Sequence, residues 1–159
     1  MRPLILIAVL ALTACERPFS PDAGVPLPVT RLAADDSTFL QFSGFRQPAR
    51  LVIQDDAAWA AAWQTMWERH GSPPPRPEVD FTRDMIILAA LGEQVSGGFG
   101  VRVDAATRNA EAVTVLVKRV VPAPPCLVVT VLTQPVDVAR LPRSPLPVRF
   151  EERTETRGC

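Results

Sequence analysis

The chain has 159 residues, enough for one domain with its own hydrophobic core. Its 17 basic residues balance its 17 acidic ones, and the basic residues form no stripe along the sequence. A chain without net charge gives no electrostatic reason to expect a nucleic acid or an anionic membrane surface as its partner. Composition therefore argues against a nucleic-acid-binding protein.

The first 15 residues have the features of an export signal. Arg2 is followed by an apolar run that is shorter than the roughly 20 residues needed to span a bilayer. Leu12-Thr13-Ala14-Cys15 resembles the lipobox of bacterial lipoproteins, in which the cysteine is acylated and becomes the mature N-terminus. We therefore expect lipidation at Cys15 and attachment to the lipid bilayer through an acyl anchor. The alternative is an ordinary export signal with a chance cysteine.

The residue after this cysteine bears on location. Some proteobacteria read an aspartate there as a signal for retention in the inner membrane, and this chain has Glu16 instead. We expect a protein of the bacterial cell envelope, facing the periplasm or exposed on the surface, with the outer membrane favoured over the inner one.

Cys126 and Cys159 remain as a pair once Cys15 is lipidated. An exported chain meets oxidising conditions, so we expect a disulfide between them. It would stabilise the fold by roughly 3 to 4 kcal/mol and would hold residues 151–158, which otherwise look frayed. The alternative is a buried thiol at Cys126, with Cys159 free or paired to another chain.

Residues 16–37 contain four prolines and no apolar periodicity, which predicts an extended tether. The folded domain is then expected at 38–159. Apolar and alternating segments separated by turn residues predict an α+β fold, with an antiparallel β-sheet or sandwich-like sheet and one main helix packed on it. The run from Met85 to Leu91 is continuously apolar, as in a strand buried on both faces. The predicted strands are residues 39–42, 50–53, 85–91, 99–104, 112–121, 127–133, 136–141 and 148–152.

The clearest helix is predicted to begin after Asp55, its N-cap, and to run to about Arg69. Trp59, Trp63 and Trp67 follow one another at intervals of four residues and so lie on one helical face. That spacing favours packing against the core over an exposed aromatic platform for a ligand such as a sugar.

Few residues suggest catalysis or metal binding. His70 is the only histidine and stands where the predicted helix ends, as a surface or capping residue. Glu78, Asp80 and Asp84 form a loose acidic group without the ligand density of a calcium loop. We therefore expect no cofactor, no metal and no enzymatic activity.

One glycine-rich segment is a candidate for contact with a partner. Ser96, Gly97, Gly98 and Phe99 could offer backbone amides and an aromatic tip, because adjacent glycines allow close backbone approach. The equal alternative is a glycine turn between two strands.

The order of short motifs resembles a known family. Ser43-Gly44-Phe45, the strand 51–53 and Asp56 ahead of the tryptophans come first. They are followed by Val79-Asp80-Phe81, Gly92 and the segment 96–99, where the family commonly shows Thr-Gly-Gly-Tyr. This pattern is similar to the C-terminal domain of the PrcB family, named for a lipoprotein subunit of a bacterial surface protease complex. The resemblance covers roughly residues 40 to 150. It implies an accessory, non-catalytic envelope protein that holds or helps to mature a protease.

Three hypotheses follow. The leading one is a membrane-tethered binding module whose sheet edge or glycine loop docks another envelope protein, such as a protease. The second is a hydrolase of envelope polymers, which would gather Asp80, Asp84 or His70 in a cleft beside exposed tryptophans. The third is a peptidase inhibitor that inserts the loop from Ser96 to Phe99.

Overall fold

The computed structural model describes residues 24–32 and 40–158. The predicted signal peptide, Cys15 and Cys159 lie outside these ranges, so the lipidation and the disulfide stay predictions. The predicted strand at 39–42 is described only from Leu40 on, and Leu40 forms an isolated bridge with Val136.

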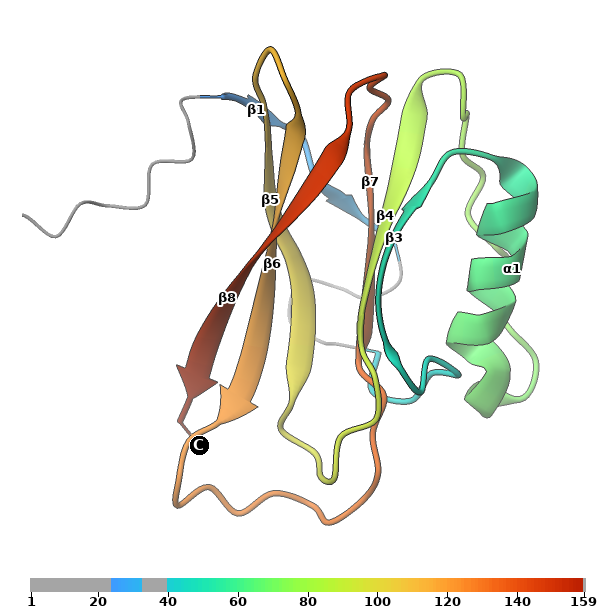
Figure 1. Cartoon of the computed structure of the whole chain (residues 1–159). Helices are drawn as coiled ribbons and strands as arrows, with labels where there is room; N and C mark the ends of the chain where they lie inside the picture. Colours follow the sequence, from blue (N-terminus) through green and yellow to red (C-terminus); the bar gives the residue numbers. More distant parts are fainter. Residues whose placement is uncertain (1–23, 33–39, 159) are drawn as a thin grey trace, which may run out of the picture.

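Two four-stranded sheets pack face to face, and a helix covers the outer face of one of them (Figure 1). The first sheet has the strand order β1-β5-β6-β8, and the second has the order β2-β7-β4-β3. A short 3-10 helix, Glu68–His70, extends the α-helix. The elements in chain order are β1 (Val25–Leu27), β2 (Thr30–Arg31), β3 (Pro48–Ile53), α1 (Asp56–Trp67), β4 (Asp84–Leu91), β5 (Gly100–Arg108), β6 (Val113–Pro122), β7 (Val136–Pro142) and β8 (Val148–Arg157).

The architecture is a β-sandwich with one small helix. The expected sandwich-like sheet is therefore found, whereas the helix makes up a smaller part of the fold than an α+β class implies. All strand pairs are antiparallel except β6 and β8, which run parallel. The parallel pair arises because β7, which separates them in the sequence, lies in the other sheet. The purely antiparallel expectation is corrected at this pair.

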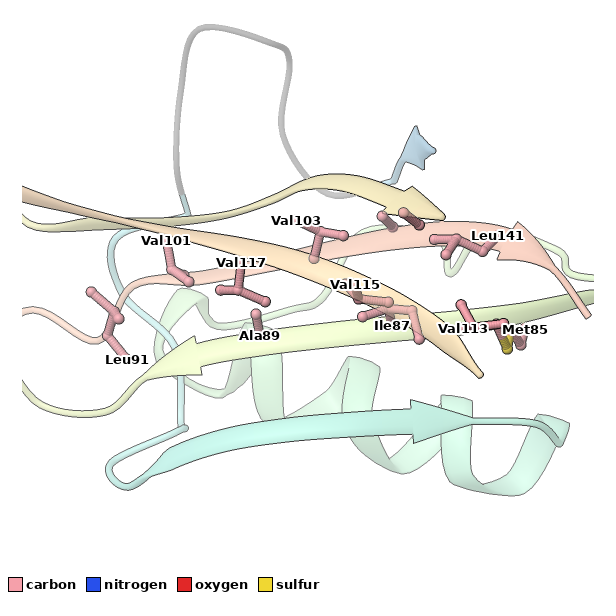
Figure 2. Close-up of a cluster of buried hydrophobic side chains, with 12 residues drawn as sticks. Met85, Ile87, Ala89, Leu91, Val101, Val103, Val113, Val115, Val117 and Leu141 are labelled. Atoms are coloured by element: carbon pink, nitrogen blue, oxygen red, sulfur yellow. The ribbon is translucent and has the colours of Figure 1, made fainter. Parts of the chain in front are cut away.

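The strand β4 has an apolar core on each side, as the continuous apolar run predicts. Its odd-numbered residues, including Ile87, face β5 and β6 across the sandwich (Figure 2). Its even-numbered residues, including Leu88, belong to a second cluster with the helix. Because side chains alternate along a strand, one run of residues builds both layers of the molecule.

The structure confirms that the tryptophan face of the helix packs against the core. The Asp55 carboxylate accepts a hydrogen bond from the amide of Ala58 at 2.8 Å and so caps the first turn. Trp59 and Trp63 are buried, and their indole N–H groups donate to the carbonyls of Pro77 and Pro74. The proline-rich loop therefore covers the helix and satisfies the polar atoms that burial of the indoles would otherwise leave unpaired.

The tether prediction is wrong for residues 25–31. The strand β1 pairs with β5 in the first sheet, and β2 pairs with β7 in the second. Apolar periodicity could not show this, because the two strands have only three and two residues. The folded domain thus begins before residue 38.

The strand prediction is also wrong for residues 127–133, which form no strand and contribute only a bridge from Thr133 to Gln94. Conversely, the tail that was expected to need the disulfide to hold it belongs to β8, whose pairing with β6 extends to Arg157 opposite Pro122. The parallel ladder pairs one side of the backbone of this charged tail with β6, which its side chains alone would not predict.

Candidate protein-binding surface

Five large apolar side chains lie exposed on two loops at one end of the sandwich. One loop joins β4 to β5 and the other joins β6 to β7, and both lie at the bottom of Figure 1. Soluble domains seldom expose apolar side chains in such number, and groups of them mark interaction sites. We call this set the apolar loop surface: Val95 (76% exposed), Leu127 (99%), Val129 (68%), Val131 (41%) and Leu132 (49%).

Hydrogen bonds hold the two loops side by side. Gln94 and Thr133 exchange both backbone hydrogen bonds, at 2.8 and 3.0 Å. The Gly97 amide donates to the carbonyl of Val129 at 2.9 Å, and the Thr133 hydroxyl donates to the carbonyl of Ser96. The exposed valines are therefore attached to an ordered support.

Gly97 and Gly98, two adjacent glycines of the β4–β5 loop, are explained by this contact. A Cβ atom on Gly97 would lie 2.7 Å from a methyl group of Val129, and one on Gly98 would lie 2.8 Å from a methyl group of Val128. Gly98 also has a φ of +84°, a backbone conformation that other residues rarely adopt. Both glycines thus let the second loop approach closely.

The segment Ser96–Phe99 was the partner-binding candidate from the sequence, and that role stays a prediction. Phe99 is half-buried and packs against the core between the sheets, so it is not an exposed aromatic tip. Ser96 is half-buried as well, and its hydroxyl donates to the carbonyl of Gly97. The loop supports the neighbouring segment, which carries most of the exposed apolar side chains.

Residues 127–132 also present unused backbone donors. Within the described ranges, the amides of Leu127, Val128, Val129, Thr130 and Leu132 donate to no backbone carbonyl, whereas the Val131 amide donates to the carbonyl of Val129 at 3.1 Å. The Val129 carbonyl thus accepts from both Gly97 and Val131, and the second of these hydrogen bonds closes a three-residue turn centred on Thr130.

A separate polar cavity of about 620 Å³ lies beside the N-terminal end of the helix. It brings together the acidic group noted in the sequence, yet Asp80 is already engaged, since it accepts hydrogen bonds from the hydroxyl and the amide of Thr82. These hydrogen bonds hold the pKa of Asp80 below its usual value, with the hydroxyl as the larger cause. The charged residues that line the cavity are Asp56, Arg76, Glu78, Asp80, Arg83, Asp84 and Arg140.

Other candidates from the sequence lie apart from both places. The His70 Nε2 atom lies 2.5 Å from the carbonyl oxygen of Phe42, in keeping with a role in holding the end of the helix. Among the described residues, no group of three or more His, Cys, Asp or Glu side chains could hold a metal ion. The Cys126 sulfur lies 3.8 Å from the carbonyl oxygen of Arg157, two residues before Cys159.

Sequence reasoning missed the apolar loop surface because residues 127–133 have the composition of a buried strand. The available signal was their flanks, since Pro124, Pro125 and Pro135 bound the segment and limit its inclusion in a sheet.

In the part of the chain that the structure describes, no helix is long and apolar enough to cross a bilayer. A family model described as PrcB C-terminal matches residues 85–142. No curated protein and no solved structure matches the chain. The family match supports membership in the PrcB C-terminal family, as the order of the motifs predicts, and the matched segment includes both loops of the apolar surface.

Proposed function

We propose that this PrcB-like chain is a non-catalytic accessory module of the bacterial cell envelope, which docks a protein of a protease complex through the apolar loop surface. The family match supports the link to a protease complex. The exposed apolar side chains carry the proposal, because a docking partner would remove them from water.

The position of the proposed lipid anchor is compatible with docking through the apolar loop surface. The lipid would be attached at Cys15, ahead of β1, which pairs with the Arg108 end of β5. The apolar loop surface lies beyond the Gly100 end of the same strand, about 27 Å away at 3.4 Å per residue. The chain would thus enter the sandwich at one end and present its binding surface at the other, away from the membrane.

The docking proposal is tested with a photo-crosslinking residue placed at Val131 in the full-length protein in its native cell. We expect one envelope protein to be crosslinked in stoichiometric yield under mild detergent. The matched control places the same residue at Glu155 on β8, an exposed position outside the surface. Absence of any crosslinked protein from Val131 under all growth conditions, or the same product from both positions, would refute docking at this surface.

The anchoring proposal has its own test. Intact-mass analysis of the protein from the membrane fraction should show cleavage before Cys15 and an added acyl mass, and Cys15→Ser should move the protein to the soluble fraction. An unmodified protein with its leader attached, recovered from the cytosol, would refute both the anchor and the compartment.

The two alternative functions have less support. A polymer hydrolase was expected to show exposed tryptophans beside a carboxylate cleft, and Trp59 and Trp63 are buried instead. A peptidase inhibitor would insert the segment Ser96–Phe99, whose aromatic residue packs inward.

A further inference from the structure

A small cavity of about 200 Å³ lies where an edge of one sheet meets an edge of the other. Its walls come from β3 and the end of β4 on one side and from β6 and β8 on the other, and β3 and β8 are both edge strands. The cavity thus combines apolar side chains with three charged ones. Its lining residues are Pro48, Ala49, Arg50, Leu91, Arg119 and Glu152.

Arg119 lies on the inner face of its sheet. It stands opposite Val101 in the β5–β6 ladder and two residues after Val117, and both valines are buried in the core between the sheets. Residues directly opposite each other, or two apart on one strand, share a face of the sheet. The Arg119 side chain therefore starts inside the sandwich, at the end of the core that Leu91 and Val101 mark in Figure 2.

Arg119 is also the cation of this cavity that lacks a partner. Its Nε–H group is buried and donates to no acceptor, and its side chain makes no hydrogen bond or ion pair with any residue that the structure describes. The Arg50 guanidinium, in contrast, donates to the Glu152 carboxylate at 2.7 and 3.0 Å. It also donates to the carbonyls of Ala49 and Ala90. A buried donor without an acceptor is costly, so the cavity favours an acceptor that comes from outside the chain.

We propose that this cavity binds a small monocarboxylate with a short apolar chain, and that Arg119 holds its carboxylate. The two guanidinium groups and the one carboxylate of the cavity leave a single positive charge, which a monoanion neutralises. The planar guanidinium fork matches a carboxylate. A phosphate dianion would instead add a surplus negative charge beside Glu152.

The apolar wall and the volume limit the rest of the ligand. Pro48, Ala49 and Leu91 can cover a short apolar chain. Ligand pockets usually measure about 300 to 1,000 Å³, so the cavity accepts only a few carbon atoms beyond the carboxylate. We expect a Kd on the order of 1 mM. A free carboxylic acid and the C-terminal end of a peptide share this chemistry. The inference goes beyond the proposed docking function and uses none of the residues of the apolar loop surface.

The test follows the NMR signal of the Arg119 Nε–H group in the full-length protein during separate titrations with butyrate and with N-acetyl-alanylalanine. At least one of the two should shift the signal in a saturable way, and the tighter binder shows whether a free acid or a peptide end is the source. The C-terminal amide of the same peptide should not bind, because it has no negative charge.

Variants separate recognition by Arg119 from a structural role. Arg119→Met, followed at the backbone amide of Leu91, should weaken binding roughly tenfold or more. It should not lower the midpoint of urea unfolding, because the arginine has no partner to lose. Arg119→Lys keeps the charge without the fork and should lose less affinity. The matched control is Arg149→Met, at an exposed arginine on β8 outside the cavity, and it should bind as the unaltered chain does.

Four results would each overturn the proposal. They are the absence of a saturable shift with both ligands, equal binding of the peptide amide, tighter binding of inorganic phosphate than of butyrate, and unchanged binding by Arg119→Met. The first three need no variant, so they hold even if Arg119→Met fails to fold. Crosslinking at Val131 involves none of these residues, so the docking proposal and this one can fail independently.

Discussion

Arg31 and Asp137 form a buried ion pair that joins three strands. Removing the Arg31 cation should therefore lower the free energy of unfolding substantially. The Arg31 guanidinium donates to Oδ1 of Asp137 at 2.8 and 3.2 Å, and the amide of Val103 donates to Oδ2 at 2.8 Å. The two side chains are 8% and 0% exposed. Since Asp137 lies on β7 and Val103 on β5, this carboxylate connects the two sheets. Its ion pair with Arg31 also holds β2 beside β7.

The perturbation is Arg31→Met, which keeps a long side chain and removes the charge. The Asp137 carboxylate then stays buried with the Val103 amide but without its cation. Breaking a buried pair on one side costs about 3 to 5 kcal/mol, because the remaining charge is uncompensated. We expect a loss of this size in the free energy of unfolding at pH 7.

The loss should depend on pH. Burial raises the pKa of Asp137 above its usual value, although the hydrogen bonds from Arg31 and Val103 act in the opposite direction. Without Arg31 the pKa rises further. A carboxyl group whose pKa is higher in the folded state than in the unfolded state stabilises the fold fully at pH values below its unfolded pKa, about 3.9. This stabilisation is lost as the pH rises through the pKa of the folded state. The difference between variant and unaltered chain should therefore shrink as pH falls from 7 toward 5.

The assay is urea unfolding of both proteins at pH 7 and pH 5, with the slope checked for two-state behaviour. The control is Arg140→Met, whose ion pair with Asp84 is longer, at 3.8 Å, with side chains 38% and 28% exposed. It should cost less than about 1 kcal/mol. If Arg31→Met costs no more than this control, or if its cost is the same at both pH values, the account of Asp137 is wrong.

Three further predictions concern packing and covalent structure. Trp59→Ala should lower the free energy of unfolding by about 3 to 5 kcal/mol, because the indole is fully buried between the helix and its sheet, and urea unfolding measures this. Gly98→Ala should cost about 1 to 3 kcal/mol through its positive φ and its close approach to the second loop; a cost near zero in the same assay would contradict the packing of the two loops. Peptide mapping without reduction should find Cys126 linked to Cys159, and reduction should lower stability by about 2 to 4 kcal/mol; two free thiols would disprove the pairing.

The helix and the central strand could be predicted because one periodic pattern determines each of them. The tryptophans at intervals of four residues fix the buried face of the helix, and the apolar run of β4 leaves no polar face to turn toward water. In both elements the local signal and the tertiary environment agree, which is the condition under which sequence patterns are reliable.

The segment that enters the sandwich and the apolar loop could not be predicted, for opposite reasons. The strands β1 and β2 are too short to show periodicity, and an ion pair from Arg31 to a residue 106 positions away helps to hold them. Residues 127–133 carry a strong local strand signal that the tertiary structure does not use. The availability of a neighbouring strand is a property of the whole fold, and no local pattern contains it.

The edge strands of the two sheets are protected against pairing with other chains, and the exposed apolar segment is not. Charged residues fill much of β8, including Arg149, Glu151 and Glu152, and Arg50 on β3 donates to Glu152 at 2.7 Å. The other two edge strands, β1 and β2, are very short. Charge and shortness are the usual protections against unwanted pairing between chains. The segment from Leu127 to Leu132 has neither protection, so its exposed apolar side chains are a cost in solubility that the function of a binding surface would explain.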